Sequence, residues 1–156
     1  MSIFSLDDET SYPPVSFYFA VYFDGITAAT DNSFQEVQGL SQEVDIEEVK
    51  EGGENRFTHR LPGRAKYSNL ILKRGMISYS SLLAVWCQEC LSGEYSEAIV
   101  PKSISIMLMD EYQLPVRTWN VVNAIPVKWQ VSDLNAMESK IAVETIELAY
   151  NYFTIV

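Results

Sequence analysis

Two cysteines and one histidine are the residues of this chain that could form a catalytic or metal site. Cys87 and Cys90 make a C-x-x-C motif, which occurs in redox-active thiol pairs and as half of a zinc site. Tetrahedral zinc needs further ligands, and His59 is the only histidine. A redox pair usually begins a helix, whereas these cysteines fall in the second half of an expected helix, on its apolar side. We therefore interpret them as buried, unreactive thiols.

The other patterns do not make a catalytic site either. His59 has no nucleophile elbow near it in the sequence. The Gly52-Gly53 pair lies between Glu51 and Glu54, which would repel an anion, so it does not match a phosphate-binding loop. The acidic residues around it do not follow the spacing of an EF-hand loop. We therefore expect no enzyme, no cofactor and no metal site, and the alternative of this class is a small cytosolic thiol oxidoreductase that uses the two cysteines.

The composition is that of one packed domain with an acidic surface. The chain has 156 residues, of which 47% are hydrophobic and 21% charged, and its net charge is −10. This charge disfavours specific nucleic-acid binding, which depends on Lys and Arg neutralising phosphates. No apolar run reaches the roughly 18 residues of a membrane span, and the first residues do not resemble a signal peptide. We expect cytoplasmic synthesis, no membrane anchor, an N-terminal arm over residues 1–16 and a single domain over residues 17–156.

Apolar residues that alternate with polar ones predict a mainly β fold. Residues 17–23 place Phe17, Phe19, Val21 and Phe23 on one face of a strand, and Asp24-Gly25 follows as a turn. A strand over residues 68–74 has Leu70 and Leu72 inward. Further strands are expected over residues 26–30, 33–40, 103–109, 116–122 and 125–131, the last two parted near Asn123-Ala124.

The period changes to that of a helix after Gly75. Apolar residues recur three or four positions apart, with Ser80 or Ser81 to cap the start and Gly93 to end the helix; they are Leu83, Trp86, Cys87, Cys90 and Leu91. The segment 139–153 fits either a helix or a buried strand, and its composition does not decide between them.

Opposite charges are segregated along the middle of the chain. Residues 36–54 hold seven acids against Lys50, whereas residues 56–75 hold six of the eleven basic residues. The glycine pair in between predicts the tip of a long hairpin, with residues 57–61 as the returning arm and Pro62-Gly63 breaking it. Segregated charges suit arms that meet complementary surfaces, on the same chain or on the next copy.

Several motifs resemble the tail tube proteins of contractile phages and of phage-tail-like injection systems. The basic stretch carries the strongest of them, Leu61-Pro62-Gly63, Lys66-Tyr67, Asn69 and Leu72-Lys73-Arg74-Gly75. An earlier block and two later blocks are also similar to that family: Glu36-Val37, Gly39-Leu40, Glu51-Gly52-Gly53 and Asn55, then Trp119-Asn120, Asn123-Ala124, Pro126 and Lys128, then residues 133–136 and 143–149.

The resemblance implies a small β-sandwich or barrel with one flanking helix and a long protruding hairpin, with residues 139–153 as strand. It implies hexameric rings that stack into the inner tube of a contractile particle, whose lumen conducts DNA or a protein payload. The implied partners are further copies of the chain, a contractile sheath protein, and baseplate and tube-terminating proteins. The alternatives within this class are a tube-initiating ring at the baseplate and a secreted tube protein of a membrane-anchored injection system.

The resemblance also gives the segregated charges a use, because the acidic arm and the basic strand would meet on neighbouring subunits. We expect the inter-subunit interface at the hairpin tip and along the basic arm, at Lys50, Glu51, Gly52, Gly53, Glu54, Asn55, Arg56, Arg64 and Lys66.

Overall fold

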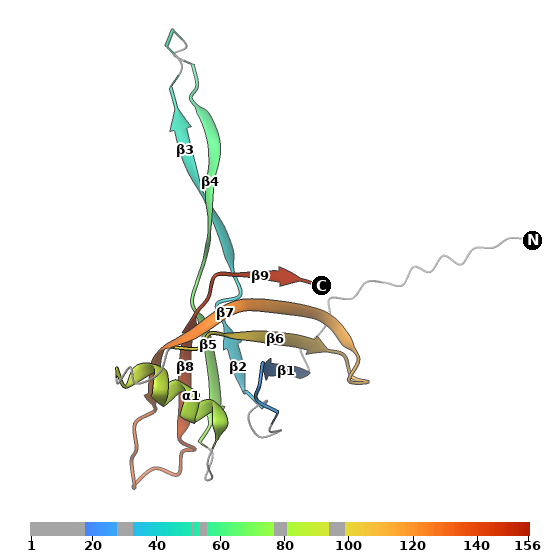
Figure 1. Cartoon of the computed structure of the whole chain (residues 1–156), viewed down its shortest axis with the longest axis vertical. Coiled ribbons are helices and arrows are strands. Elements are labelled where there is room, and N and C mark those ends of the chain that lie inside the picture. The colour runs from blue at the N-terminus through green and yellow to red at the C-terminus, as the bar shows by residue number, and fades with distance from the viewer. Residues whose placement is uncertain (1–17, 28–32, 51, 54–55, 77–80, 94–98) are drawn as a thin grey trace, which may run out of the picture.

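The described part of the chain is mostly strand, with a single helix. The computed structural model describes residues 18–27, 33–50, 52–53, 56–76, 81–93 and 99–156. Figure 1 shows a bent sheet with the helix beside it and a hairpin that stands out from the body. The elements are β1 (Tyr18–Phe23), β2 (Glu36–Gln38), β3 (Gln42–Val49), β4 (His59–Tyr67), β5 (Leu70–Gly75), α1 (Leu82–Leu91), β6 (Lys102–Met109), β7 (Pro115–Val131), β8 (Val143–Ala149) and β9 (Tyr152–Ile155).

One antiparallel sheet of seven strands forms the body. Its order is β1-β6-β7-β8-β5-β2, and β9 also pairs with β7. The 17-residue strand β7 joins the two halves of the sheet, because its first part pairs with β6 and β9 and its second part with β8. The sequence predicted two strands here, parted near Asn123-Ala124, and this was wrong. Asn123 has a φ of 55°, which asparagine tolerates better than most residues, so the strand continues through this position.

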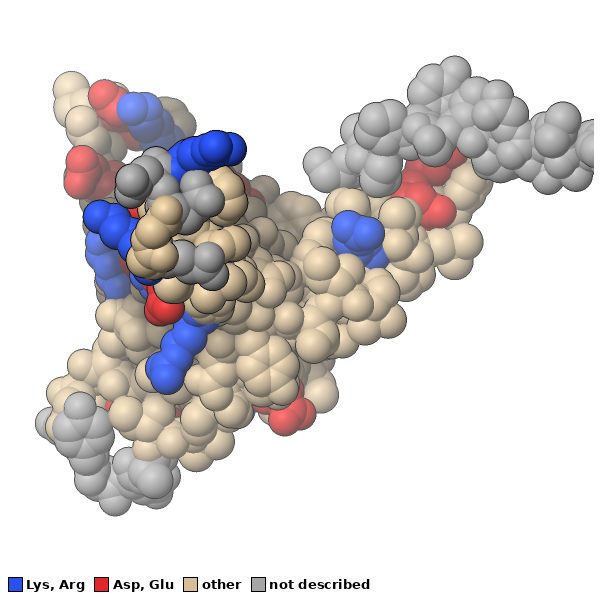
Figure 2. Space-filling view, turned by 90° about the horizontal axis from the view of Figure 1, so that it is seen from above, with Lys and Arg blue, Asp and Glu red and all other residues tan. Residues whose placement is uncertain are grey.

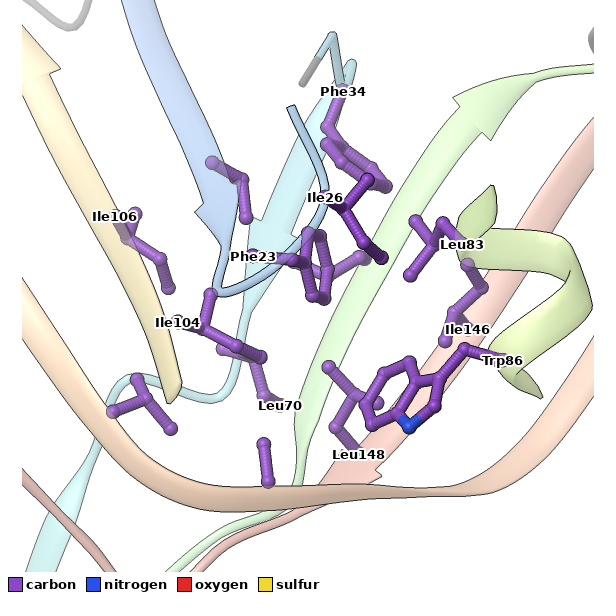
Figure 3. Close-up of a cluster of buried hydrophobic side chains, with 14 of the residues drawn as sticks. Phe23, Ile26, Phe34, Leu70, Leu83, Trp86, Ile104, Ile106, Ile146 and Leu148 are labelled. Atoms are coloured by element: carbon purple, nitrogen blue, oxygen red, sulfur yellow. The ribbon is translucent and has the colours of Figure 1, made fainter. Parts of the chain in front are cut away.

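The buried apolar side chains of the described residues form one core between the sheet and the helix. Leu70 and Leu72 are fully buried, as their alternation predicted. The Phe23 ring lies 6.2 Å from the Phe34 ring and 6.1 Å from the Trp86 ring, and Figure 3 shows these side chains converging from β1, the loop before β2 and the helix. Each fully buried side chain of this size contributes about 1.5–3 kcal/mol. The core therefore depends on contacts between segments far apart in the sequence.

The helix and the C-terminal segment follow the sequence pattern. Ser81 is the N-cap of α1, and its hydroxyl accepts a hydrogen bond from the Ala84 amide at 3.2 Å. The segment 139–153 supplies β8 and part of β9, so the strand implied by the family resemblance is confirmed. Every second residue of β8 is buried; these residues are Glu144, Ile146 and Leu148.

Two short strands differ from their predicted bounds. Within residues 33–40 only Glu36–Gln38 form a strand. Of the expected return strand 26–30, the described part holds only an isolated bridge between Phe23 and Ile26, at the Asp24-Gly25 turn. The predicted arm over residues 1–16 lies outside the described residues, as does Phe17.

Candidate functional site

The β3–β4 hairpin is a two-stranded ribbon that projects from the body along the longest axis of the molecule (Figure 1). Its register runs from Gln42 opposite Tyr67 at the base to Val49 opposite His59 near the tip. All eight residues of β3 are exposed. Because β3 and β4 form a sheet of their own among the described strands, both faces of the ribbon are open to a partner, which would also stabilise a ribbon that is only marginally stable alone.

The predicted break at Pro62-Gly63 was wrong, because β4 runs through both residues. Val44 pairs with Ala65 and Ile46 with Pro62, so two residues of β4 lie opposite Asp45 and form a bulge. A ribbon without further neighbours has free edges, where a residue lacking an N–H is tolerated. The hairpin is therefore longer than the sequence predicted.

The acidic and basic arms meet within one chain. The Lys66 ammonium lies 2.6 Å from the Asp45 carboxylate, and that hydrogen bond, with the negative charge of Asp45, raises the pKa of Lys66. Glu48 lies opposite Arg60 in the register. The prediction that the acidic and basic arms meet on neighbouring subunits stays a prediction, and the structure adds that Lys66 has an ion-pair partner, Asp45, on its own chain. Exposed ion pairs add little stability, so we assign them mainly to setting the register of the hairpin.

The structure places the predicted interface residues along this ribbon. Lys50, Gly52, Gly53 and Arg56 are exposed near the tip, Arg64 is exposed in the bulge, and Lys66 is exposed toward the base. Glu51, Glu54 and Asn55 lie outside the described residues. Lys and Arg side chains gather on the hairpin in the view onto this end of the molecule (Figure 2).

The ribbon also exposes apolar side chains that the charge pattern concealed. Between 42% and 58% of each side chain is exposed for five of them, Val44, Ile46, Val49, Phe57 and Leu61. Val44 and Ile46 lie on one face of the ribbon, whereas Val49 lies on the other, together with Leu61 opposite Glu47. The alternation of Val44 and Ile46 with acidic residues was visible in the sequence. In the structure these apolar side chains lie on the projecting ribbon, outside the core of the body.

Close packing at the base holds the hairpin against the body. Gly39 has a φ of 94°, and a Cβ atom there would lie 2.0 Å from the carbonyl oxygen of Asn69. The Tyr67 ring lies 5.2 Å from the Phe153 ring and 5.8 Å from the Tyr150 ring. Burial, followed by the neighbouring Tyr67, raises the pKa of Tyr150, whose hydroxyl donates a hydrogen bond to the Gly39 carbonyl at 3.4 Å. These contacts fix the direction in which the hairpin projects from the body.

A buried polar network links the helix to the sheet. The Arg74 guanidinium donates to the Glu144 carboxylate at 2.7 Å and to the Ser81 hydroxyl at 3.0 Å, and the Trp129 indole donates to Glu144 at 2.6 Å. Arg74 and Glu144 are 2% and 3% exposed. The sequence analysis counted Arg74 among the basic residues of the stretch 56–75 and made no prediction of its burial. Its position two residues after Leu72 on the same face of β5 was the pattern that could have shown its burial.

Both cysteines lie on the helix, as predicted, but only Cys87 is buried, whereas Cys90 is half-buried at the edge of the core. Cys87 is buried, and burial raises the pKa of the Cys90 thiol, so little thiolate forms at neutral pH. Within the described ranges, no three His, Cys, Asp or Glu side chains are grouped so that they could hold a metal ion. In the same part of the chain, no helix is long and apolar enough to cross a membrane.

Replacing both cysteines by serine is expected to lower the free energy of unfolding by about 1–3 kcal/mol and to leave assembly intact. Serine places a more polar hydroxyl at the buried position 87, where the thiol packs as a small apolar group. Urea unfolding and electron microscopy of the double variant would measure the two effects. Rapid labelling of the folded wild type by a thiol reagent, at the rate of the urea-unfolded chain, would instead indicate reactive thiols.

Comparisons with known proteins agree with this geometry. The family model of the T4-like virus tail tube protein gp19 matches residues 15–154. A chain in the 6-fold symmetrised structure of the anti-feeding prophage baseplate is 31% identical, with a TM-score of 0.79 over 94% of this chain and 97% of that chain. A chain in the extended sheath-tube complex of the PVC extracellular contractile injection system is 24% identical, with a TM-score of 0.79 and 99% of both chains covered. A chain in the PVC sheath/tube terminator is 24% identical, with a TM-score of 0.79 over 94% of this chain and 99% of that chain. No curated protein matches the chain significantly.

Proposed function

This chain belongs to the T4-like virus tail tube protein gp19 family, and on this premise we propose that it is the repeating subunit of the inner tube of a contractile tail or injection particle. The observation that carries the proposal is the family match over residues 15–154, which includes the hairpin and all of the sheet except Ile155 at the end of β9. The function is structural, and the fold supplies a rigid body with a projecting ribbon. The chain has no proposed catalytic role.

The assembly that this function requires is a stack of hexameric rings. The solved anti-feeding prophage baseplate has 6-fold symmetry, and the PVC structures contain a sheath-tube complex and a sheath/tube terminator. By this likeness the partners of the chain are its own copies, a contractile sheath protein, and baseplate and terminating proteins. Cytoplasmic synthesis precedes assembly into the particle, and the lumen conducts DNA or a protein payload.

The hairpin is the inter-subunit surface in this proposal. Its exposed ribbon carries charged residues at the tip and in the bulge, and apolar residues between them. Contacts of exposed charges fix register and partner choice more than they add affinity, whereas the apolar residues supply the area to be buried. We therefore assign Lys50, Gly52, Gly53, Arg56, Arg64 and Lys66 to the interface, together with Glu51, Glu54 and Asn55 of the tip.

A second candidate is a tube-initiating ring at the baseplate. The identity of 31% is to a chain of a baseplate structure, against 24% for the chain of the sheath-tube complex. An initiating subunit has one end that fits the baseplate and one that fits the tube, so the purified protein would stop at single rings. A repeating subunit has matching ends and grows long tubes. Negative-stain electron microscopy of the purified protein separates the two.

Deleting residues 50–55 is expected to abolish tubes while the subunit still folds. The described residues of this segment are exposed and make no contact with the core, and loop shortening costs a folded domain little. Circular dichroism and thermal melting measure folding, and electron microscopy measures assembly. A variant with six Gly and Ser residues in place of the segment keeps its length and tests its side chains. Full-length tubes from the folded deletion variant would remove the tip from the interface.

A further inference from the structure

The connection between β7 and β8 is a preformed loop with apolar side chains in solvent. Its neck is closed by two hydrogen bonds of 2.8 Å, from the Ser132 amide to the Val143 carbonyl and from the Val143 amide to the Ser132 hydroxyl. Leu134, Met137 and Ile141 are nevertheless 78%, 93% and 76% exposed. A loop that holds its shape while exposing three large apolar side chains has the character of a contact site.

This loop surrounds a hollow of about 900 Å³, which opens to solvent. Its lining comes from residues 132–143 alone and includes Leu134, Ile141 and Val143. Its volume lies within the roughly 300–1,000 Å³ of ligand pockets, which is ample for an aromatic side chain. The hollow therefore suits an apolar anchor from another surface.

The hairpin presents such an anchor at the other end of the molecule. Figure 1 shows the hairpin at one end of the longest axis and the β7–β8 connection at the opposite end. Phe57, just before β4, is 58% exposed and touches only the edge of His59 among the described aromatic rings, at 5.4 Å. Nothing lies within 4 Å of a Cβ atom built on Gly52 or Gly53, so the tip is slender enough to enter a hollow.

We propose that the loop Ser132–Val143 is the receptor for the hairpin end of a second copy of this chain in the next ring, with Phe57 of that copy packed against Leu134 and Ile141. The inference rests on the proposed function, in which copies stack. The exposed apolar residues of the hairpin and those of the β7–β8 loop lie at opposite ends of the molecule. One head-to-tail contact therefore buries both, and its repetition gives an open stack and not a closed pair. An aromatic anchor in a pocket is the usual centre of such an interface.

A cysteine pair that flanks the contact, His59→Cys with Ala136→Cys, tests this placement and leaves Phe57 and Leu134 in place. Tubes of the variant are oxidised with copper phenanthroline and run on a non-reducing gel beside each single variant. The expected result is a ladder of covalent multimers that extends beyond six chains, because the links run from ring to ring. A ladder that ends at six would place the contact within one hexameric ring and overturn the proposal. Intact tubes without cross-links would also overturn the proposed contact, but they would agree with the proposed tube function. The tube function itself would be contradicted only if the wild type formed no tubes or rings.

The anchor is tested by Phe57→Ala with Tyr112→Ala as the matched control. Tyr112 is an aromatic residue, 75% exposed, in the turn between β6 and β7, away from the loop. Loss of a central aromatic anchor is expected to raise the critical concentration for tube growth about 30-fold. The Tyr112 variant is expected to assemble like the wild type. Equal critical concentrations for the two variants would show that Phe57 is not the anchor.

Discussion

Arg74→Met is expected to lower the free energy of unfolding by about 3–5 kcal/mol, because it removes one partner of a buried ion pair. The Glu144 carboxylate would keep its hydrogen bond from Trp129 but lose the guanidinium, and the hydroxyl of the N-cap residue Ser81 would lose the hydrogen bond that it accepts from Arg74. For a domain of this size the change corresponds to roughly 6–20 °C in melting temperature. Urea unfolding of the monomer, at concentrations where no rings form, measures it.

Lys73→Met is the matched control for this experiment. Lys73 is the preceding residue in β5, and its ion pair with Glu36, at 3.5 Å, has side chains 36% and 46% exposed. Exposed pairs of this kind contribute about 0–1 kcal/mol. The double variant Arg74→Met with Glu144→Leu is expected to recover much of the lost stability, since no charge is left buried alone. Equal losses for Arg74→Met and Lys73→Met would show that the network does not hold the helix to the sheet.

Gly39→Ala is expected to cost about 2–5 kcal/mol and to prevent tube growth. Its Cβ atom would lie 2.0 Å from the backbone oxygen of Asn69, so the chain on one side must move. That movement turns the hairpin at its base, where Tyr67 and Tyr150 now hold it. Melting temperature and electron microscopy together measure the loss of stability and of assembly.

Gly53→Ala separates the steric effect from the backbone conformation. Gly53 has a φ of 96°, close to the 94° of Gly39, but no atom lies within 4 Å of the added methyl group. This variant therefore carries only the strain of an L-residue at positive φ, about 1–2 kcal/mol. Tubes formed by folded Gly39→Ala protein would indicate that the direction of the hairpin does not matter for assembly.

Local pattern was enough to predict most of the fold. Alternation in residues 17–23 and 68–74, and the three-to-four spacing around Trp86, correspond to β1, β5 and α1. The errors lie at Pro62-Gly63 and Asn123-Ala124, where residues that usually end strands sit inside them. A β-bulge accommodates Pro62-Gly63 within β4, and a positive φ at Asn123 lets β7 continue past Asn123-Ala124. Both features depend on pairing with neighbouring strands. Such pairing is not visible in a local window.

The candidate site was predicted only in part. Charge segregation predicted the hairpin. It did not show that Lys66 of β4 forms an ion pair with Asp45 of β3 in the same chain. The apolar loop around Met137 was missed, because a short run of mixed residues has no period, and its exposure follows from the fold. The burial of Arg74 was not predicted, because its ion-pair partner Glu144 lies 70 residues away in the sequence and only the fold brings the two side chains together.

Strand β7 also determines when the chain can complete its fold during synthesis. Phe19 of β1 pairs with Leu108 of β6, and Leu70 of β5 pairs with Leu148 of β8, so the early strands must wait for partners made much later. These long-range pairings close slowly, whereas the β3–β4 hairpin needs only its own residues. The residues of the ribbon therefore leave the ribosome before those of β7, but the ribbon stays marginally stable until Tyr150 and Phe153 pack at its base. On a polysome, neighbouring nascent chains would expose their hairpin segments while the proposed receptor loops between β7 and β8 are still unmade, which would delay self-association until each subunit has folded.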